Sequence, residues 1–267
     1  MKNNFFNQIK KSLIAKTPHE KIELFQKTYQ EFINDTFTFT PTVNIEIFTQ
    51  PAYSDFCNIV DQRKVPQRKN LALKEGQTIL LHAIAHIEYS AIDLALDACY
   101  RFQDMPKEFY EDWMKVADDE IRHFIMINEL MESYEVKYGD IDVHQGLFEA
   151  CMKTQDLIPR MALIPRYMEA NGLDANAMMI NKLKKIQNTE DIVKLLEIIL
   201  EEEVDHVLKG DKWYKYACNQ KEDFSCDYFQ IVNSVYPNSF KTNKNVNVEA
   251  RKKAGFSDEE INILLQS

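Results

Sequence analysis

The amino-acid sequence predicts an all-α protein built around four long helices. Glycine and proline are rare, at six and eight residues, and long stretches free of both favour helices over turn-rich β structure. Apolar residues recur at helical spacing through most of the chain. Two Glu-x-x-His motifs alternate with two isolated glutamates, which is the ligand order of four-helix bundles that hold two metal ions.

Length and composition limit the classes of protein to consider. The 267 residues suit one large domain or one domain with extensions, and a net charge of -10 argues against a nucleic-acid surface. Five scattered cysteines without a CxxC pair predict neither a disulfide framework nor a thiolate zinc site, so a cytoplasmic location is expected. No apolar run approaches the roughly 20 residues of a membrane span, and the N-terminus has no signal-peptide pattern.

The first region, residues 1–70, is predicted to pack on the bundle as helices and an extended arm. Apolar spacing favours helices over residues 5–14 and 19–35. Threonine and aromatic residues alternate over residues 35–51, which predicts a short strand or an extended segment. Pro41 and Pro51 argue against a central strand.

The bundle itself is predicted to occupy residues 71–218. Its four helices are expected over residues 71–102, 106–134, 143–170 and 191–218. Pro106 suits the first turn of the second helix. Pro165 should kink the third helix near Met161, and Asn171-Gly172 should end it as a C-cap, ahead of a short helix over residues 174–186.

The last region, residues 219–267, is expected to be a helical extension. It comprises a helix over residues 223–235, a polar linker over 237–247 and a terminal helix. Ser257 and Glu260 have the spacing of a capping box at the start of that last helix.

The two Glu-x-x-His motifs are the candidate metal ligands. A glutamate and a histidine three residues apart lie on one helix face, so both can reach one ion. The six candidate ligands, one isolated glutamate before each motif, are Glu88, Glu120, His123, Glu169, Glu203 and His206. The second set follows the first at offsets of 81 and 83 residues, as two similar helical hairpins would produce.

Carboxylate oxygens and imidazole nitrogens favour a divalent first-row metal, here two iron ions, with manganese as the alternative. Four carboxylates would roughly balance two dications in a core of low dielectric constant. A single Glu-x-x-His match carries little information, but two within apolar helices, each with an embedded glutamate before it, are strong evidence. The competing interpretation is that these groups form surface salt bridges and helix-face charges.

Four neighbouring residues are candidates for support of the metal ligands. His86 is favoured as a buried hydrogen-bonding partner, with metal ligation, together with His82, as the alternative. Asp119 and Asp205 either orient the ligating imidazoles or are solvated charges. Arg166, beside the expected kink, either binds an anionic substrate or faces solvent.

Several stretches together resemble one family over residues 51–256. They are LLHAIAHIEYSAIDLALDACYRF, MPKEFYEDWMKVADDEIRHF, YGDIDVHQGLFEA, RMALIPRYMEANGLD, EEEVDHVLKGDKWY and NVEARKKAGFS. They resemble a bacterial ferritin-like family known mainly as domain of unknown function 455, which is distantly similar to di-iron tRNA hydroxylases. The resemblance implies a ferritin-like bundle with a di-metal carboxylate centre, and none of the six ligand positions is substituted.

Three functions follow as hypotheses. The first is a di-iron oxidase or oxygenase acting on an unidentified small or macromolecular substrate. The second is metal binding without turnover, in a structural or storage role. The third is a tRNA-modifying hydroxylase, which the acidic balance does not support. The expected assembly is a soluble protein without a membrane or nucleic-acid partner, with a homodimer as the oligomeric state considered.

Overall fold

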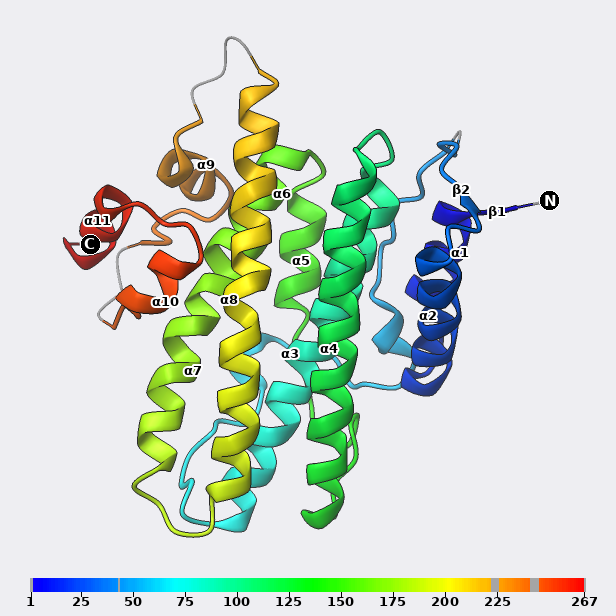
Figure 1. Cartoon of the computed structure of the whole chain (residues 1–267). Helices are drawn as coiled ribbons and strands as arrows, with labels where there is room; N and C mark the ends of the chain where they lie inside the picture. The colour runs from blue at the N-terminus through cyan, green and yellow to red at the C-terminus, as the bar shows by residue number, and fades with distance from the viewer. Residues whose placement is uncertain (1, 43, 222–225, 241–244, 267) are drawn as a thin grey trace. The chain divides into compact units, whose positions relative to one another are not determined.

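The computed structural model describes residues 2–42, 44–221, 226–240 and 245–266, and its regular structure is almost entirely helical (Figure 1). The all-α prediction is therefore confirmed. The chain divides into two compact units, Met1–Phe148 and Glu149–Ser267.

In the first unit, two helices and a short strand pair precede the longest helices. The helices α1 (Phe5–Leu13) and α2 (Pro18–Ile33) are capped by Asn4 and Thr17, whose side chains accept backbone N–H bonds. Strands β1 (Asn3–Asn4) and β2 (Phe37–Thr38) pair in parallel, so the short-strand prediction for residues 35–51 is confirmed for two residues. The arm that follows contains two single turns, η1 (Ala52–Asp55) and η2 (Gln62–Lys64).

The helices α3 (Lys74–Arg101) and α4 (Lys107–Ser133) pack along each other as a hairpin (Figure 1). Pro106 lies at the N-cap of α4, one position before the first turn. The helix α3 is long and apolar enough to cross a membrane, but 67% of its most apolar window is buried inside the protein. The most apolar part of α3 therefore lies mainly in the core of the first unit.

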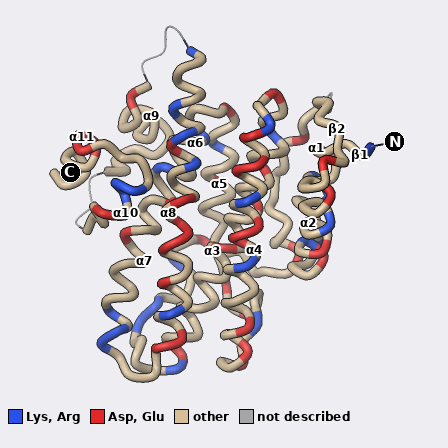
Figure 2. Tube along the Cα trace, in the orientation of Figure 1, with Lys and Arg blue, Asp and Glu red and all other residues tan. Residues whose placement is uncertain are grey.

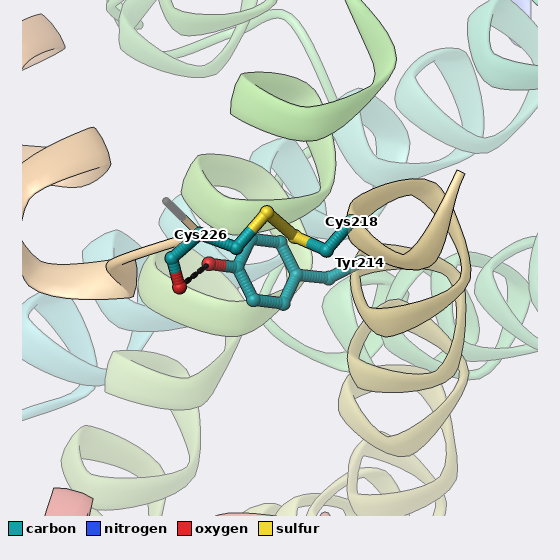
Figure 3. Close-up of a disulfide and its surroundings, with 3 residues drawn as sticks. All are labelled: Tyr214, Cys218 and Cys226. Atoms are coloured by element: carbon teal, nitrogen blue, oxygen red, sulfur yellow. Dashed lines mark hydrogen bonds between the residues drawn. A yellow bond between two sulfur atoms is a disulfide. The ribbon is translucent and has the colours of Figure 1, made fainter. Parts of the chain in front are cut away.

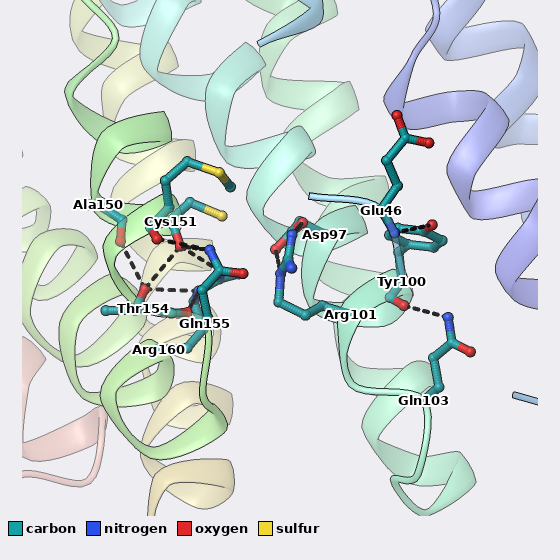
Figure 4. A network of polar contacts seen from close by, with 11 residues as sticks. Glu46, Asp97, Tyr100, Arg101, Gln103, Ala150, Cys151, Thr154, Gln155 and Arg160 are labelled. Carbon is teal, nitrogen blue, oxygen red and sulfur yellow. Dashed lines mark hydrogen bonds and ion pairs between the residues drawn. The ribbon is translucent and has the colours of Figure 1, made fainter. Parts of the chain in front are cut away.

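Polar contacts attach the arm to the end of α3 (Figure 4). The backbone N–H of Glu46 donates to the Tyr100 hydroxyl at 3.0 Å, and the Gln103 amide donates to the Tyr100 carbonyl at 2.8 Å. Next to them, Arg101 and Asp97 form a buried ion pair at 2.7 Å. These contacts satisfy buried polar groups where α3 ends.

The second unit is built on an interrupted helical run that packs along one long helix. After α5 (Gly146–Lys153), the run comprises α6 (Leu157–Leu163), the π-helix η3 (Ile164–Glu169) and α7 (Ala170–Leu183). All three parts of the run contact α8 (Glu190–Asn219) (Figure 1).

The predicted helix end at Asn171-Gly172 is wrong, because α7 continues through both residues to Leu183. A glycine C-cap needs a left-handed backbone, and Gly172 is not among the residues with positive φ. The break falls earlier, between α5 and α6. There the buried Arg160 side chain donates to the carbonyls of Thr154 and Cys151, which stabilises the end of α5 (Figure 4).

Pro165 distorts the helix as expected, but by a different route from a kink near Met161. The π-helix Ile164–Glu169 surrounds the proline, and such widened turns absorb a missing N–H and a steric clash. The helix α8 passes close by at Gly210, where a Cβ atom would lie 2.2 Å from the Pro165 Cβ. Only glycine permits this approach.

We expect opposite effects from alanine at two helical glycines of this unit. Gly210→Ala should lower the free energy of unfolding by about 1–3 kcal/mol or more, because the new methyl overlaps the Pro165 ring. Gly172→Ala should raise it by about 0.5–1 kcal/mol, because open space surrounds that position and alanine favours the helix. Urea unfolding of both variants provides the measurement, and equal effects would contradict the close contact.

Three shorter helices complete the second unit: α9 (Tyr228–Val235), α10 (Val248–Lys253) and α11 (Asp258–Gln266). The capping box is confirmed, since Ser257 and Glu260 each accept the other's backbone N–H, at 3.1 and 2.9 Å. The expected helix over residues 223–235 is found from Tyr228, while residues 222–225 and linker residues 241–244 lie outside the described part.

One disulfide joins Cys218, at the end of α8, to Cys226 (Figure 3). The Tyr214 hydroxyl donates to the carbonyl of Cys226 at 3.1 Å, so this tyrosine also contacts Cys226. The sequence predicts no disulfide framework, and this single bridge does not form one. The separation of eight residues matches no sequence motif, so the sequence did not indicate this pair.

Candidate metal centre

In the first unit, α3 and α4 place three candidate ligands together. Glu88 is 5% exposed, Glu120 1% and His123 0%. The Nδ1 atom of His123 lies 3.1 Å from the Glu88 Oε2 and 3.5 Å from the Glu120 Oε2. One ligand atom from each residue lies within 4.8 Å of the others, so the three side chains could hold one ion.

The helical pattern explains this burial. Ala85, Glu88 and Ile92 follow at intervals of three and four residues on α3, and all three are buried. On α4, Glu120 and His123 are followed by Ile127 on the same buried stripe. The glutamates thus occupy positions where an apolar residue would ordinarily stand, which is the observation that a surface-charge interpretation fails to explain.

The electrostatics of the three groups show two buried carboxylates that repel each other beside one imidazole. Burial and the neighbouring Glu120 raise the pKa of Glu88 to about 7. Burial lowers the pKa of His123, but the hydrogen bonds that His123 donates to Glu120 and Glu88 outweigh it and raise that pKa to about 11. No lysine or arginine in the described part pairs with Glu88. A dication fits this donor set, since it would balance carboxylates that otherwise depend on an imidazolium.

The second unit carries the second triad of candidate ligands, Glu169, Glu203 and His206. Glu203 and His206 lie one turn apart on α8, with the His206 Nδ1 3.3 Å from the Glu203 Oε1. His206 is fully buried, whereas Glu203 and Glu169 are half-buried. Glu169 is the last residue of η3, which packs against α8. Each unit therefore carries one Glu-x-x-His motif and one additional glutamate.

Both ring nitrogens of His86 are used within the first unit. Nε2 lies 2.7 Å from the His144 carbonyl, which can only accept, so Nε2 carries the proton. Nδ1 then accepts from the Tyr138 hydroxyl at 2.9 Å. This arrangement is that of a buried hydrogen-bonding histidine, and it leaves neither nitrogen for a metal.

His82, one turn earlier on α3, is also neutral. Its Nε2 accepts the backbone N–H groups of Gly139 and Ile141, at 3.0 and 3.3 Å, so its proton is on Nδ1. Burial lowers the pKa of His82 to about 4. His82 thus attaches the loop after α4 to α3 only in its neutral form.

We therefore expect acid to destabilise the protein through His82. The unfolded chain takes up this proton near pH 6.5 and the folded protein only near pH 4, so stability falls as the pH falls between those values. Between pH 7 and 5, the contribution of His82 should be about 1–2 kcal/mol, allowing for partial solvent screening. Urea unfolding of wild type and His82→Gln, which keeps an acceptor, should show a smaller pH dependence in the variant; identical dependence would contradict this role.

The two aspartates considered as imidazole partners make ion pairs along their own helices. Asp119 is buried and accepts from Lys115 and Arg122 at 2.6 and 2.7 Å. Asp205 is exposed and pairs with Lys209. Figure 2 shows acidic and basic residues interspersed along α4 and α8 in this manner. Orientation of a ligating imidazole by either aspartate stays a prediction.

Arg166 neither faces solvent nor lacks a partner. Its side chain is 1% exposed and pairs with Asp211 at 2.8 Å and Glu260 at 2.9 Å. The guanidinium lies 4.5–5.0 Å from the ring centres of three aromatic residues, Tyr214, Tyr228 and Phe256. The solvent-facing alternative is wrong, because the side chain is buried. The sequence did not reveal this burial, since the partners of Arg166 come from distant parts of the chain.

Comparison with known proteins places this chain in a family. The model of the family described as "Protein of unknown function (DUF455)" matches residues 14–262. The chain belongs to the DUF455 family. It is also 34% identical, over 275 residues, to an uncharacterized protein of Haemophilus influenzae, covering 96% of this chain and 92% of that protein. No solved structure matches. Neither the family description nor the name of the Haemophilus influenzae protein states an activity. Any function given to this DUF455 member must therefore be supported by the site itself.

Proposed function

We propose that the two triads combine into one two-metal centre at the core of a ferritin-like four-helix bundle. The buried cluster of Glu88, Glu120 and His123 is the observation that carries the proposal, because its carboxylates require a cation. The matching triad in the second unit, at nearly constant offset, supplies the same donors a second time. Together they give one histidine to each ion and leave four carboxylates to share.

The proposed activity is that of an oxygen-dependent di-iron oxidase or oxygenase. Bound iron would supply the capacity to reduce oxygen and oxidise a substrate. The chain's own contribution is to hold five ligands on the long helices α3, α4 and α8 and Glu169 at the end of η3, and to exclude water from around His123 and His206, both fully buried. Displacement of the proton of His123 would accompany metal binding.

Metal binding without turnover is the second candidate. The buried carboxylates and imidazole of Glu88, Glu120 and His123 could hold an ion in a structural or storage role without any substrate. The tRNA hydroxylase hypothesis rests only on basic residues of the arm, such as Arg63 and Lys64, against a net charge of -10.

Anaerobic loading with ferrous iron, followed by metal analysis and an oxygen electrode, tests the proposal. We expect about two iron ions per chain, from the ligand count, and oxygen consumption on exposure to air. Loading without oxygen consumption would support the non-catalytic role. Zinc alone, or no bound metal, would contradict the di-iron centre.

A cytoplasmic location is part of the proposal, and the Cys218–Cys226 disulfide is the observation that opposes it. Thiol labelling of protein rapidly denatured in acid from whole cells measures the state of this pair directly. Reduced thiols support the cytoplasm, and a complete disulfide supports an oxidising compartment.

A further inference from the structure

A cavity of about 190 Å³ lies in the first unit, between one face of α3 and the arm. Its walls come from residues of α3, from residues 62–68 and from residues 141–144. On α3, Ile79 lines it, and a helix turns about 100° per residue, so Glu88 points about half a turn away from Ile79. The cavity is therefore separate from the candidate metal ligands, and what it binds does not depend on the proposed function.

A histidine presents an N–H donor at this cavity. Since the Nε2 of His82 accepts two backbone N–H bonds, its Nδ1 is a donor, with no hydrogen bond in the described part of the chain. A ligand that meets these walls needs hydrogen-bond acceptors.

The charges of the lining residues indicate one negative charge on the ligand. Arg68 is exposed and has no carboxylate partner among the described residues, and its guanidinium can hold a carboxylate through two parallel bonds. The lining carboxylate, Asp142, accepts from the Asn58 amide at 2.7 Å. One free guanidinium beside one carboxylate suits a monoanion better than a doubly charged phosphate.

The remaining walls are apolar, with Ile79, Ile87 and Val143 among them. A cavity of about 150 Å³ lined by such side chains is large enough for benzene. We propose that this cavity binds a small organic monocarboxylate, with its carboxylate on Arg68 and the donor of His82 and a body of benzoate size against the isoleucines. Inorganic anions lack the body, and neutral amides lack the charge.

Titration of the full-length protein with benzoate, followed by calorimetry and by NMR of the histidine side chains, tests the proposal. A ligand of this size should bind one site per chain with a dissociation constant on the order of 1 mM, with a shift of the His82 Nδ1–H signal. Benzamide and inorganic phosphate should bind about tenfold more weakly or not at all. Two results would overturn the proposal. One is equal affinity for benzamide and benzoate, and the other is no saturable binding at a benzoate concentration about ten times the expected dissociation constant.

Matched variants distinguish recognition from general charge. Arg68→Gln should weaken benzoate binding about tenfold, whereas Lys69→Gln, the same charge change on the adjacent exposed residue outside the lining, should leave it unchanged. Ala83→Met should block binding by filling the cavity while preserving its charge. Equal effects of the two glutamine variants, or binding undiminished in Ala83→Met, would place benzoate elsewhere and refute the site.

Discussion

Iron content is expected to fall from about two ions per chain to none when Glu120 is replaced by glutamine. The substitution keeps the shape of the side chain and removes one carboxylate from a cluster whose ligand atoms lie within 4.8 Å of one another. Metal analysis after anaerobic iron loading measures the change. Unaltered iron content would remove Glu120 from the site.

The same substitution should lower two pKa values in the metal-free protein. Glu120 repels the buried carboxylate of Glu88 and accepts a hydrogen bond from His123, and both interactions raise the pKa of the neighbouring group. A neutral amide at position 120 should therefore lower the pKa of Glu88 and that of His123. NMR titration of the His123 side chain measures the change, and an unaltered pKa would contradict the contact between these groups.

Variants of α8 show whether the two triads form one centre. Glu203→Gln should lower iron content as Glu120→Gln does, and Glu201→Gln, an exposed control two residues away, should leave it unchanged. In a shared centre, either ligand substitution should release both ions. Loss of one ion from each variant would instead indicate two independent sites and contradict the di-metal proposal.

The sequence was sufficient for the features that local pattern determines. The positions of α3, α4 and α8 were predicted within a few residues, because apolar periodicity and helix-breaking residues specify them. The burial of Glu88 was predictable for the same reason, since it shares a stripe with Ile92. These are properties that follow from neighbours along one helix.

Long-range contacts determine what the sequence did not reveal. Gly172 had the pattern of a helix end, but α7 continues through it. Pro165 is accommodated in a π-helix that no propensity predicts. The disulfide between Cys218 and Cys226 likewise matches no local sequence pattern. Such features depend on tertiary packing, which overrides local preference.

Arg166→Met is expected to lower the free energy of unfolding by about 3–5 kcal/mol, because it leaves Asp211 charged, buried and without its main counterion. Burial already raises the pKa of Asp211, and Arg166 acts against that shift. Exposed Arg63, paired with Asp61 at 2.9 Å, provides the control: Arg63→Met should leave the free energy of unfolding nearly unchanged. Comparable losses for both arginines, measured by urea unfolding, would contradict the buried pair.

The double variant Arg166→Met, Asp211→Asn makes the reason for that loss testable. Once residue 211 is neutral, the buried charge that Arg166 balanced is gone, while the charges left without this partner, on Glu260 and Lys215, are 22% and 56% exposed. The double variant should therefore be more stable than Arg166→Met alone. The packing of methionine against Tyr228 and Phe256 would retain part of the apolar contact. Arg166 and Glu169 share the π-helix η3, so the iron content of the double variant tests a second role of Arg166. If the double variant regains stability but still binds little iron, Arg166 positions Glu169 for metal binding.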